Sequence, residues 1–188
     1  TLAISKIDWD SFETSWDFQC HPLIQNCHGV DNEKGEEQAY IEDAYTEWEF
    51  DCNRRFNQLK ANEEELNRIF IDIYGLQDEL TPEVEDKDVT VRKADLGRDI
   101  RSFISYAVGC MFGRYSLYNE GILYAGGAGR DFGSIVDKIQ DCLHAQGKSR
   151  FPENEFYPDR DNIIPICDDE YFEDDIVGLF VKFVKTVY

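Results

Sequence analysis

Basic residues are scarce in this chain of 188 residues, where 19 Lys and Arg stand against 39 Asp and Glu. The formal net charge is −20. Affinity for the phosphate backbone of a nucleic acid comes largely from Lys and Arg. The charge therefore argues against a general nucleic-acid-binding protein, although it does not forbid a local contact patch.

Long apolar runs are also missing, since no stretch approaches the ~20 residues of a membrane span. The six cysteines show no tight framework spacing and follow no secretory signal, which predicts reduced thiols in a soluble, cytoplasmic protein. Hydrophobic residues make up 42% of the chain, enough for one folded module over 1–188. There is no initial Met, and an apolar pattern still runs at Tyr188. We therefore expect a fragment of a larger protein.

Histidines, which act as the general base in many hydrolases, are few in this chain. The three histidines, His21, His28 and His144, have no identifiable nucleophile and carboxylate neighbours, which argues against an independent hydrolase. A nuclease of the restriction type would need Asp and Glu-x-Lys across a hairpin, and the sequence offers no convincing pair of strands for it. Catalysis is therefore not predicted from the residues themselves.

One apolar stripe dominates the pattern that is present. From about Glu33 the period becomes helical, and the phase survives one missed turn at Asn62. Two interpretations remain: one helix to Tyr74, longer than ~60 Å, or two helices with a new start at Asn62. The preserved phase favours one helix, ended by Gly75. The stripe consists of Ile41, Tyr45, Trp48, Cys52, Phe56, Leu59, Leu66, Phe70 and Ile73.

Shorter elements are predicted around this helix. Residues 1–31 are expected to form an irregular aromatic arm that lays Trp9, Trp16 and Phe18 against the helices. Thr81-Pro-Glu is typical of a helix start, and 89–92 alternates like a short strand. Further helices are expected over 98–112, from Ile135 to Gly147 and from about Glu170, with an extended piece at 163–166. The fold class is mainly α (α+β with a few short strands), a long helix with smaller helices packed on it.

Several patterns suggest sites but have plainer explanations. Cys20-His21 and Cys27-His28 are zinc-ligand types, but adjacent ligands bind one ion awkwardly. No metal is therefore predicted, and the four residues are interpreted as chance surface residues. The glycine-rich loop at 124–129 lacks the strand-turn-helix context of a cofactor loop. The acidic clusters at 33–49 and 168–175 lack calcium-binding spacing and are interpreted as solvated helix faces. The remaining cysteines are predicted to be core residues: Cys52, Cys110, Cys142 and Cys167.

Five of the 19 basic residues lie within fifteen positions, and the scarcity of basic residues elsewhere makes this group visible. At the junction of two elements, Arg and Lys side chains can bind phosphates. The competing interpretation is that they form salt bridges with the abundant carboxylates. Lys148 and Arg150 are two further basic residues ahead of a proline loop. The group is Lys87, Arg92, Lys93, Arg98 and Arg101, and the candidate DNA contacts within it are Arg92, Lys93, Arg98 and Arg101.

Three long strings carry a resemblance that spans most of the chain. The longest, from Asn62 to Leu117, reads NEEELNRIFIDIYGLQDELTPEVEDKDVTVRKADLGRDIRSFISYAVGCMFGRYSL. The others are IDWDSFETSWDF at 7–18 and DNIIPICDDEYFEDDIV at 161–177. They resemble the region after the catalytic domain in PglX-type adenine-specific DNA methyltransferases of BREX phage-defence systems.

This resemblance implies a parent protein that transfers a methyl group from S-adenosylmethionine to adenine N6. The Asn/Asp-Pro-Pro-Tyr/Phe motif of such enzymes is absent, because no two of the five prolines are adjacent. We therefore expect a non-catalytic spacer or DNA-recognition-associated module, with no catalytic residue and no cofactor of its own, and with other domains of the same chain, defence-system proteins or DNA as partners. The alternative is an acidic interaction module, or DNA mimic, that binds a partner protein.

Overall fold

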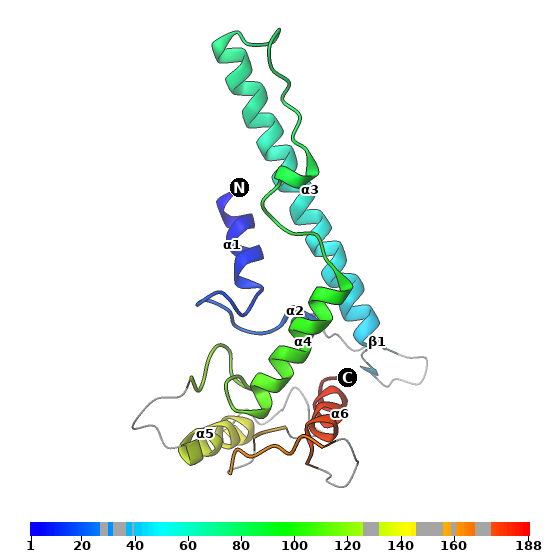
Figure 1. Cartoon of the computed structure of the whole chain (residues 1–188), viewed down its shortest axis with the longest axis vertical. Coiled ribbons are helices and arrows are strands. Elements are labelled where there is room, and N and C mark those ends of the chain that lie inside the picture. Colours follow the sequence, from blue (N-terminus) through cyan, green and yellow to red (C-terminus); the bar gives the residue numbers. More distant parts are fainter. Residues whose placement is uncertain are drawn as a thin grey trace.

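The computed structural model describes residues 1–26, 30–31, 37–38, 40–125, 132–145, 156–158, 161–167 and 174–188. Over these residues the fold is mainly α, with smaller helices packed near a long one, which confirms the predicted class (Figure 1). The only strands in these ranges are β1 (Val30–Asp31) and β2 (Glu37–Gln38), paired antiparallel. The helices are α1 (Leu2–Asp10), α2 (Pro22–Gln25), α3 (Ile41–Tyr74), the 3-10 helix η1 (Asp86–Asp88), α4 (Leu96–Met111), α5 (Phe132–Ala145) and α6 (Ile176–Val187).

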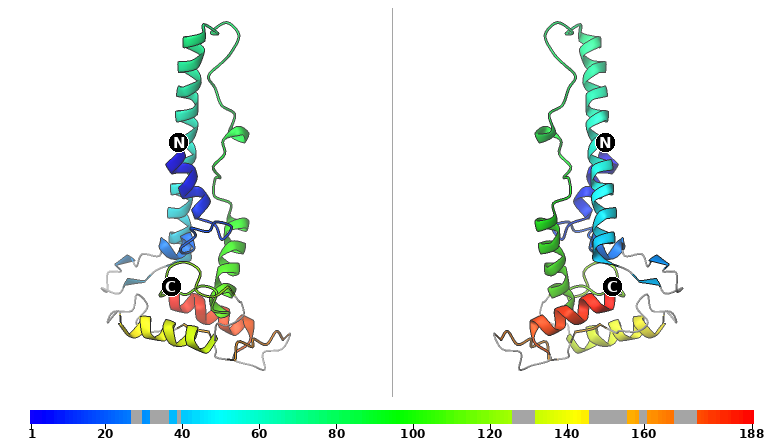
Figure 2. Two further views of the ribbon diagram at one scale, coloured as in Figure 1. Left: turned by 90° about the vertical axis from the view of Figure 1, so that its left-hand side faces the viewer. Right: turned by 90° about the vertical axis from the view of Figure 1, so that its right-hand side faces the viewer.

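Helix α3 is continuous over 34 residues, so the one-helix interpretation is confirmed and no break occurs at Asn62. It begins after Tyr40, later than the predicted start near Glu33, and at ~1.5 Å per residue it is about 50 Å long. It ends at Gly75, whose φ of 66° is left-handed, a conformation that costs a residue with a Cβ. The chain then runs back alongside α3 toward α4 (Figure 2).

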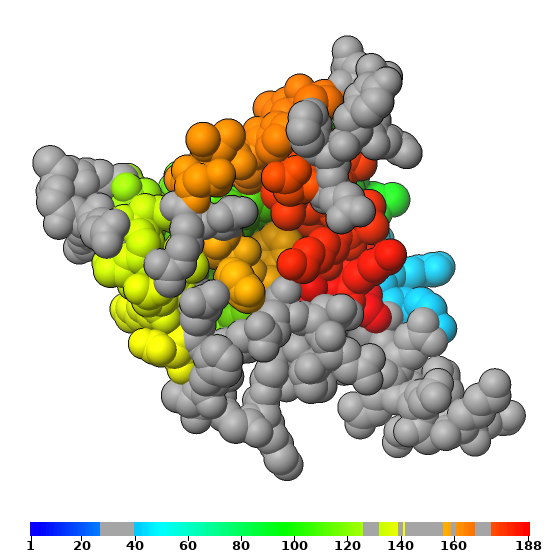
Figure 3. All heavy atoms as spheres, turned by 90° about the horizontal axis from the view of Figure 1, so that it is seen from below, coloured from blue at the N-terminus to red at the C-terminus, as the bar shows by residue number. Residues whose placement is uncertain are grey.

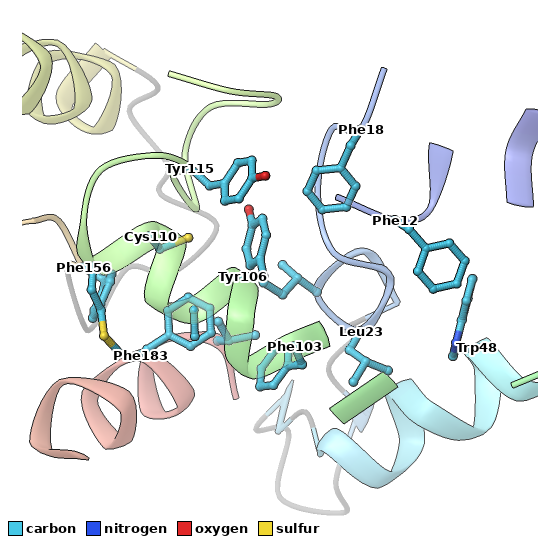
Figure 4. Packing of buried hydrophobic residues seen from close by; sticks show 14 of the residues in the cluster. Phe12, Phe18, Leu23, Trp48, Phe103, Tyr106, Cys110, Tyr115, Phe156 and Phe183 are labelled. Carbon is cyan, nitrogen blue, oxygen red and sulfur yellow. The ribbon is translucent and has the colours of Figure 1, made fainter. Parts of the chain in front are cut away.

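The main core lies at the lower end of α3, around α4. Phe103 and Tyr106 of α4 face Phe183 of α6, and Tyr106 stacks on Tyr115 with the ring centroids 5.0 Å apart (Figure 4). Phe18 meets the Tyr106 and Tyr115 rings edge-on. Such ring pairs add roughly 0.5–1.5 kcal/mol each to the burial itself. The core therefore joins helices that lie far apart in the sequence.

A second, smaller cluster lies higher on α3. Phe56 and Leu59 pack there against Val89 and Val91 of the returning chain. Residues 89–92 do not form the predicted strand in the structure, although their alternation is real: the valines point inward and Thr90 is exposed. The pattern was produced by one helix on one side rather than by a paired sheet.

Two further expectations about local structure were wrong. Thr81-Pro-Glu starts no helix, because this stretch is extended along α3 and the Pro82 carbonyl accepts from Asn67 Nδ2 at 3.2 Å. The N-terminal segment is not irregular throughout, since it begins with α1. Trp16 is 93% exposed and Trp9 is also exposed, whereas Phe18 of the same segment is buried as expected.

The lower face of the molecule carries α5 and α6 (Figure 3). The helix predicted through Ile135 is α5. The last helix begins at Ile176, not near Glu170, because the Asp175 carboxylate caps it by accepting from the Gly178 amide at 2.6 Å. Residues 163–166 form neither a helix nor a strand, which is compatible with the extended piece expected there. Ile163 and Ile166 are exposed. None of the described helices is long and apolar enough to cross a membrane.

Candidate nucleic-acid interface

The predicted basic group lies where α1, α3 and the start of α4 converge. Arg92 and Lys93 belong to the extended chain before α4, and Arg98 and Arg101 to the first turns of that helix. Asp95 fixes the start of α4, because its carboxylate accepts from the Arg98 amide at 2.7 Å. The sequence therefore places a capped helix start directly after a basic segment.

A buried carboxylate, Asp99, holds this junction together. It is 2% exposed and accepts hydrogen bonds from Trp48 Nε1 at 3.0 Å, from the Asp95 amide at 3.0 Å and from Arg98 Nε at 2.7 Å. Three donors satisfy the charge, which a buried carboxylate requires. Helix α3 is thereby tied to α4 through one side chain on each.

A second carboxylate, Asp8 of α1, is buried on the other side of the junction. Its Oδ1 accepts from the Arg92 amide at 3.4 Å. Burial raises the pKa of Asp8, and the backbone hydrogen bond from Arg92 and the charges of Arg92, Arg55 and Arg98 oppose that rise. Arg98 therefore acts on both buried carboxylates, because it pairs with Asp99 and its charge opposes the rise in the pKa of Asp8.

The same basic side chains also lie over aromatic rings. The Arg92 guanidinium is 4.5 Å from the centroid of Phe12, and that of Arg98 is 5.4 Å from the same ring. Lys93 Nζ is 4.3 Å from the Phe56 ring. Cation–π contacts of this kind contribute roughly 0.5–1 kcal/mol at exposed sites. They hold the basic side chains in fixed positions on the surface.

Ion pairs account for part of the group, as the competing interpretation predicted. Lys93 Nζ is 2.8 Å from Asp86, Lys87 Nζ is 2.6 Å from Glu85, and Arg98 pairs with Asp99. Hydrogen bonds from Lys60 and Lys93 lower the pKa of Asp86 to about 2. Among the described residues no carboxylate forms an ion pair with Arg101, which is exposed. Contact of these residues with DNA stays a prediction, and Arg101 is best placed to make it.

Of the four residues in the possible zinc pattern, the structure describes Cys20 and His21. His21 is buried and caps α2, because its Nδ1 accepts from the Leu23 amide at 3.3 Å. It is therefore a structural residue rather than the chance surface residue that was expected. Burial lowers the pKa of His21 to about 3, against a smaller opposing effect of Asp99. Tyr106 OH donates to Cys20 Sγ at 3.7 Å. Cys27 and His28 lie outside the described residues, within which no group of metal ligands gathers.

The other predicted positions fall in varied places. Cys52 and Cys110 are buried as predicted, but Cys167 is exposed, so its assignment to the core was wrong. Outside the described part lie the glycines of the 126–129 loop, Lys148, Arg150, most of the 168–175 cluster and the Cys142 side chain. Sequence reasoning missed the two buried carboxylates, Asp8 and Asp99. The one available signal was that Asp99 lies in the first turn of a helix whose stripe also contains Phe103.

Comparisons with known proteins give a consistent result. Adenine-specific methyltransferase PglX of Lacticaseibacillus casei (strain Zhang) is 44% identical over 189 aligned residues, which cover all of this chain and 14% of that protein. Adenine-specific methyltransferase BrxX of Escherichia coli O9:H4 (strain HS) is 31% identical over 202 aligned residues, all of this chain and 15% of that protein. The chain thus spans about one seventh of the length of these curated relatives. No family model matches it.

Proposed function

Because this chain is a region of the PglX/BrxX type, we propose that it is the non-catalytic spacer of an N6-adenine-specific DNA methyltransferase that serves in phage defence or restriction-modification. The full protein would use S-adenosylmethionine and act on DNA in the cytoplasm. The observation that carries the spacer role is helix α3. It is continuous over 34 residues, yet the main core packs only on its lower part.

A rigid rod transmits distance, whereas two hinged helices do not. Helix α3 has no kink-forming Pro or Gly in its interior, and its lower end is fixed by Trp48 and Asp99. The returning chain packs on its middle, where Val89 and Val91 are buried with Phe56 and Leu59 of α3. Lys60 Nζ also lies 2.7 Å from Asp86 there. We infer that α3 holds its far end at a set distance from the core and from the domains that flank this region.

The spacer role is tested by changing the length of α3 in the full-length protein that carries this chain. Two helical turns (~7 residues, ~10 Å) are added after Ile73, with ~3 extended residues added after Leu80 to complete the return. Site-specific adenine methylation should fall at least tenfold, and donor binding by the catalytic domain should be unchanged. The matched control adds only the ~3 residues after Leu80. Unchanged methylation in the extended protein would refute the spacer role.

The DNA contact is tested separately through Arg101, because Arg92 and Arg98 also support the fold through Phe12. Arg101→Gln should weaken DNA binding by the full-length protein at low salt and reduce the slope of log affinity against log salt by about 1. Arg54→Gln is the control, because Arg54 is exposed on α3 and pairs with Asp51 at 2.8 Å. An unchanged salt slope for the Arg101 variant would remove DNA contact from this surface.

The acidic DNA-mimic alternative is less well supported. It accounts for the net charge of −20, but a chain that aligns along its whole length inside two methyltransferases needs no separate role. The isolated chain is expected to bind no S-adenosylmethionine, because the motifs that position donor and adenine are missing. Titration calorimetry of the chain with the donor tests this, and micromolar binding would contradict it.

A further inference from the structure

The far end of α3 carries apolar side chains that the described elements leave open to solvent. Ile73 and Tyr74 are 68% and 70% exposed. Their neighbours on the same end follow the helical period of the buried stripe below, so a helix face continues beyond its own core. A continuous apolar patch on a protruding element marks an interaction surface more often than a scattered apolar residue does. The other exposed members on α3 are Leu66, Ile69 and Phe70, and Leu80 is exposed in the segment that follows the helix.

This end is hollowed as well as apolar. The last turns of α3 and the turn that follows enclose a groove of about 310 Å³. Its walls are mostly apolar, and the polar lining residues are Asn67, Tyr74 and Thr81. A groove of this size fits one or two large side chains rather than an extended small molecule. It is lined by Asn67, Phe70, Ile71, Tyr74, Leu76, Leu80 and Thr81.

The groove is preformed by hydrogen bonds of the turn. The Leu76 amide donates to the Ile71 carbonyl at 3.0 Å, and the Leu80 amide donates to the Leu76 carbonyl at 3.0 Å. Glu64 accepts from the Val84 amide at 3.3 Å and so holds the returning chain against α3. Because the walls are already ordered, an incoming side chain loses little free energy to their rearrangement.

The segment that carries the groove is strongly acidic. Residues 61–85 contain eight Asp or Glu and a single basic residue, Arg68. Arg68 itself pairs with Glu65. Such a surface repels phosphate backbones and anionic lipids. It also disfavours a second copy docked tip to tip, because a two-fold contact would bring the two acidic segments together.

We propose that this end, the tip groove, docks a partner protein that inserts one or two large apolar side chains flanked by Lys and Arg. The apolar side chains would fill the groove and supply the affinity, as buried anchors do at protein interfaces. The flanking Lys and Arg would meet the acidic side chains of residues 61–85 and speed the encounter. This docking surface is independent of the spacer role, since it requires only the local geometry of residues 64–84.

The probe is a pair of synthetic helical peptides of about five turns, identical in their Leu ridge and flanked by Lys in one and by Glu in the other. Binding to the full-length protein that carries this chain is measured by fluorescence anisotropy. The Lys-flanked peptide should bind saturably, and more weakly as salt rises, whereas the Glu-flanked peptide should not bind. A third peptide, with Lys retained and Leu replaced by Ala, should bind at least tenfold more weakly.

Two matched variants assign the binding to the groove. Phe70→Ala should weaken the Lys-flanked peptide about tenfold, because Phe70 lines the groove. Phe50→Ala should leave affinity unchanged, because Phe50 is an equally large, exposed residue of α3 outside the groove. Circular dichroism of each variant confirms that the helices are retained.

Four outcomes would overturn the proposal. Equal binding of the Ala-ridge peptide would show attraction by charge alone, and no effect of Phe70→Ala would place the binding outside the groove. Sedimentation velocity in which Phe70→Ala abolishes self-association would show that a second copy covers the groove. Hydroxyl-radical footprinting in which Phe70 and Tyr74 are protected in the full-length protein without peptide would show that another part of the same chain covers it.

Discussion

The two halves of α3 continue one apolar stripe, but they have different surroundings. In the lower half, Trp48 and Phe56 are each 4% exposed and meet rings or valines from other elements. In the upper half, Phe70 and Ile73 follow the same helical period and are exposed. The difference lies in the neighbours rather than in the helix. A periodic stripe therefore predicts a helix and its apolar face, and only the rest of the fold decides how much of that face is buried.

The largest expected effect is at the lower end. Trp48→Ala removes a buried ring that meets Phe12 edge-on and whose Nε1 donates to Asp99. We expect the free energy of unfolding to fall by ~3–5 kcal/mol, as in other large-to-small core changes. Urea denaturation followed by circular dichroism measures it. Phe50→Ala, an exposed change in the same half, should alter it by less than about 1 kcal/mol. Similar losses for both would mean that the lower half is not a core.

The second effect is a pH dependence of the lower end through His21. Its folded pKa of about 3 lies below the ordinary 6.5, so the unfolded chain binds the proton first as the pH falls. Stability from this group is complete above pH 6.5 and is lost as the pH falls toward about 3. Between pH 7.5 and 4.5 the loss should be about 2–3 kcal/mol.

His21→Asn retains a side chain that caps a helix but no longer titrates. The difference in unfolding free energy between the wild type and this variant, measured at several pH values, isolates the histidine from the many carboxylates. The variant should lose less stability than the wild type over that interval. Parallel pH profiles would contradict the burial of His21. The upper half of α3 is far from His21 in the sequence and the fold. The free energy of its local unfolding should therefore be the same in the wild type and in His21→Asn.

The third effect concerns the end of the upper half. Gly75 adopts a φ of 66°, and a Cβ built there would meet nothing within 4 Å. Gly75→Ala should therefore cost only the strain of a left-handed backbone at a residue with a Cβ, ~1–2 kcal/mol. The destabilisation should be confined to the turn at the end of α3. Hydrogen exchange should be faster at the Leu76 amide, which donates to Ile71. Gly75→Asn should cost less, because Asn tolerates this conformation better. Equal exchange in all three proteins would show that the turn does not depend on Gly75.

The sequence was most informative where one local signal decided the structure. The phase of the stripe across Asn62 and the stop at Gly75 predicted α3, and both are physical properties of a single helix. The sequence was less informative where the structure depended on which other element a segment packs against. Alternation at Val89 and Val91 reports one buried side, which a helix provides as well as a strand does. Trp16 was expected to be buried because of its size, yet a loop residue needs a surface to pack on.

The candidate site shows the same division. The grouping of Arg92, Lys93 and Arg98 was visible in the sequence, and the structure does bring these residues to one junction. Asp99 carries one weak signal, its place in the first turn of α4, and nothing in the sequence distinguishes Asp8 from the other acidic residues of the chain. The burial of both depends on α1, α3 and α4 meeting. The contacts that fix the basic side chains were therefore beyond sequence reasoning, although the side chains themselves were not.

The smallest effect is the sharpest test of the comparison. Phe70→Ala removes a large ring from the stripe, as Trp48→Ala does, but at a position that is 54% exposed. The cost in unfolding free energy should be less than about 1 kcal/mol, because Ala favours the helix and little buried area is lost. If the same change weakens binding of the Lys-flanked peptide about tenfold, Phe70 contributes to docking without contributing to folding. A loss of ~3 kcal/mol or more in the isolated chain would instead place Phe70 in a core, and the two halves of α3 would then differ only in degree.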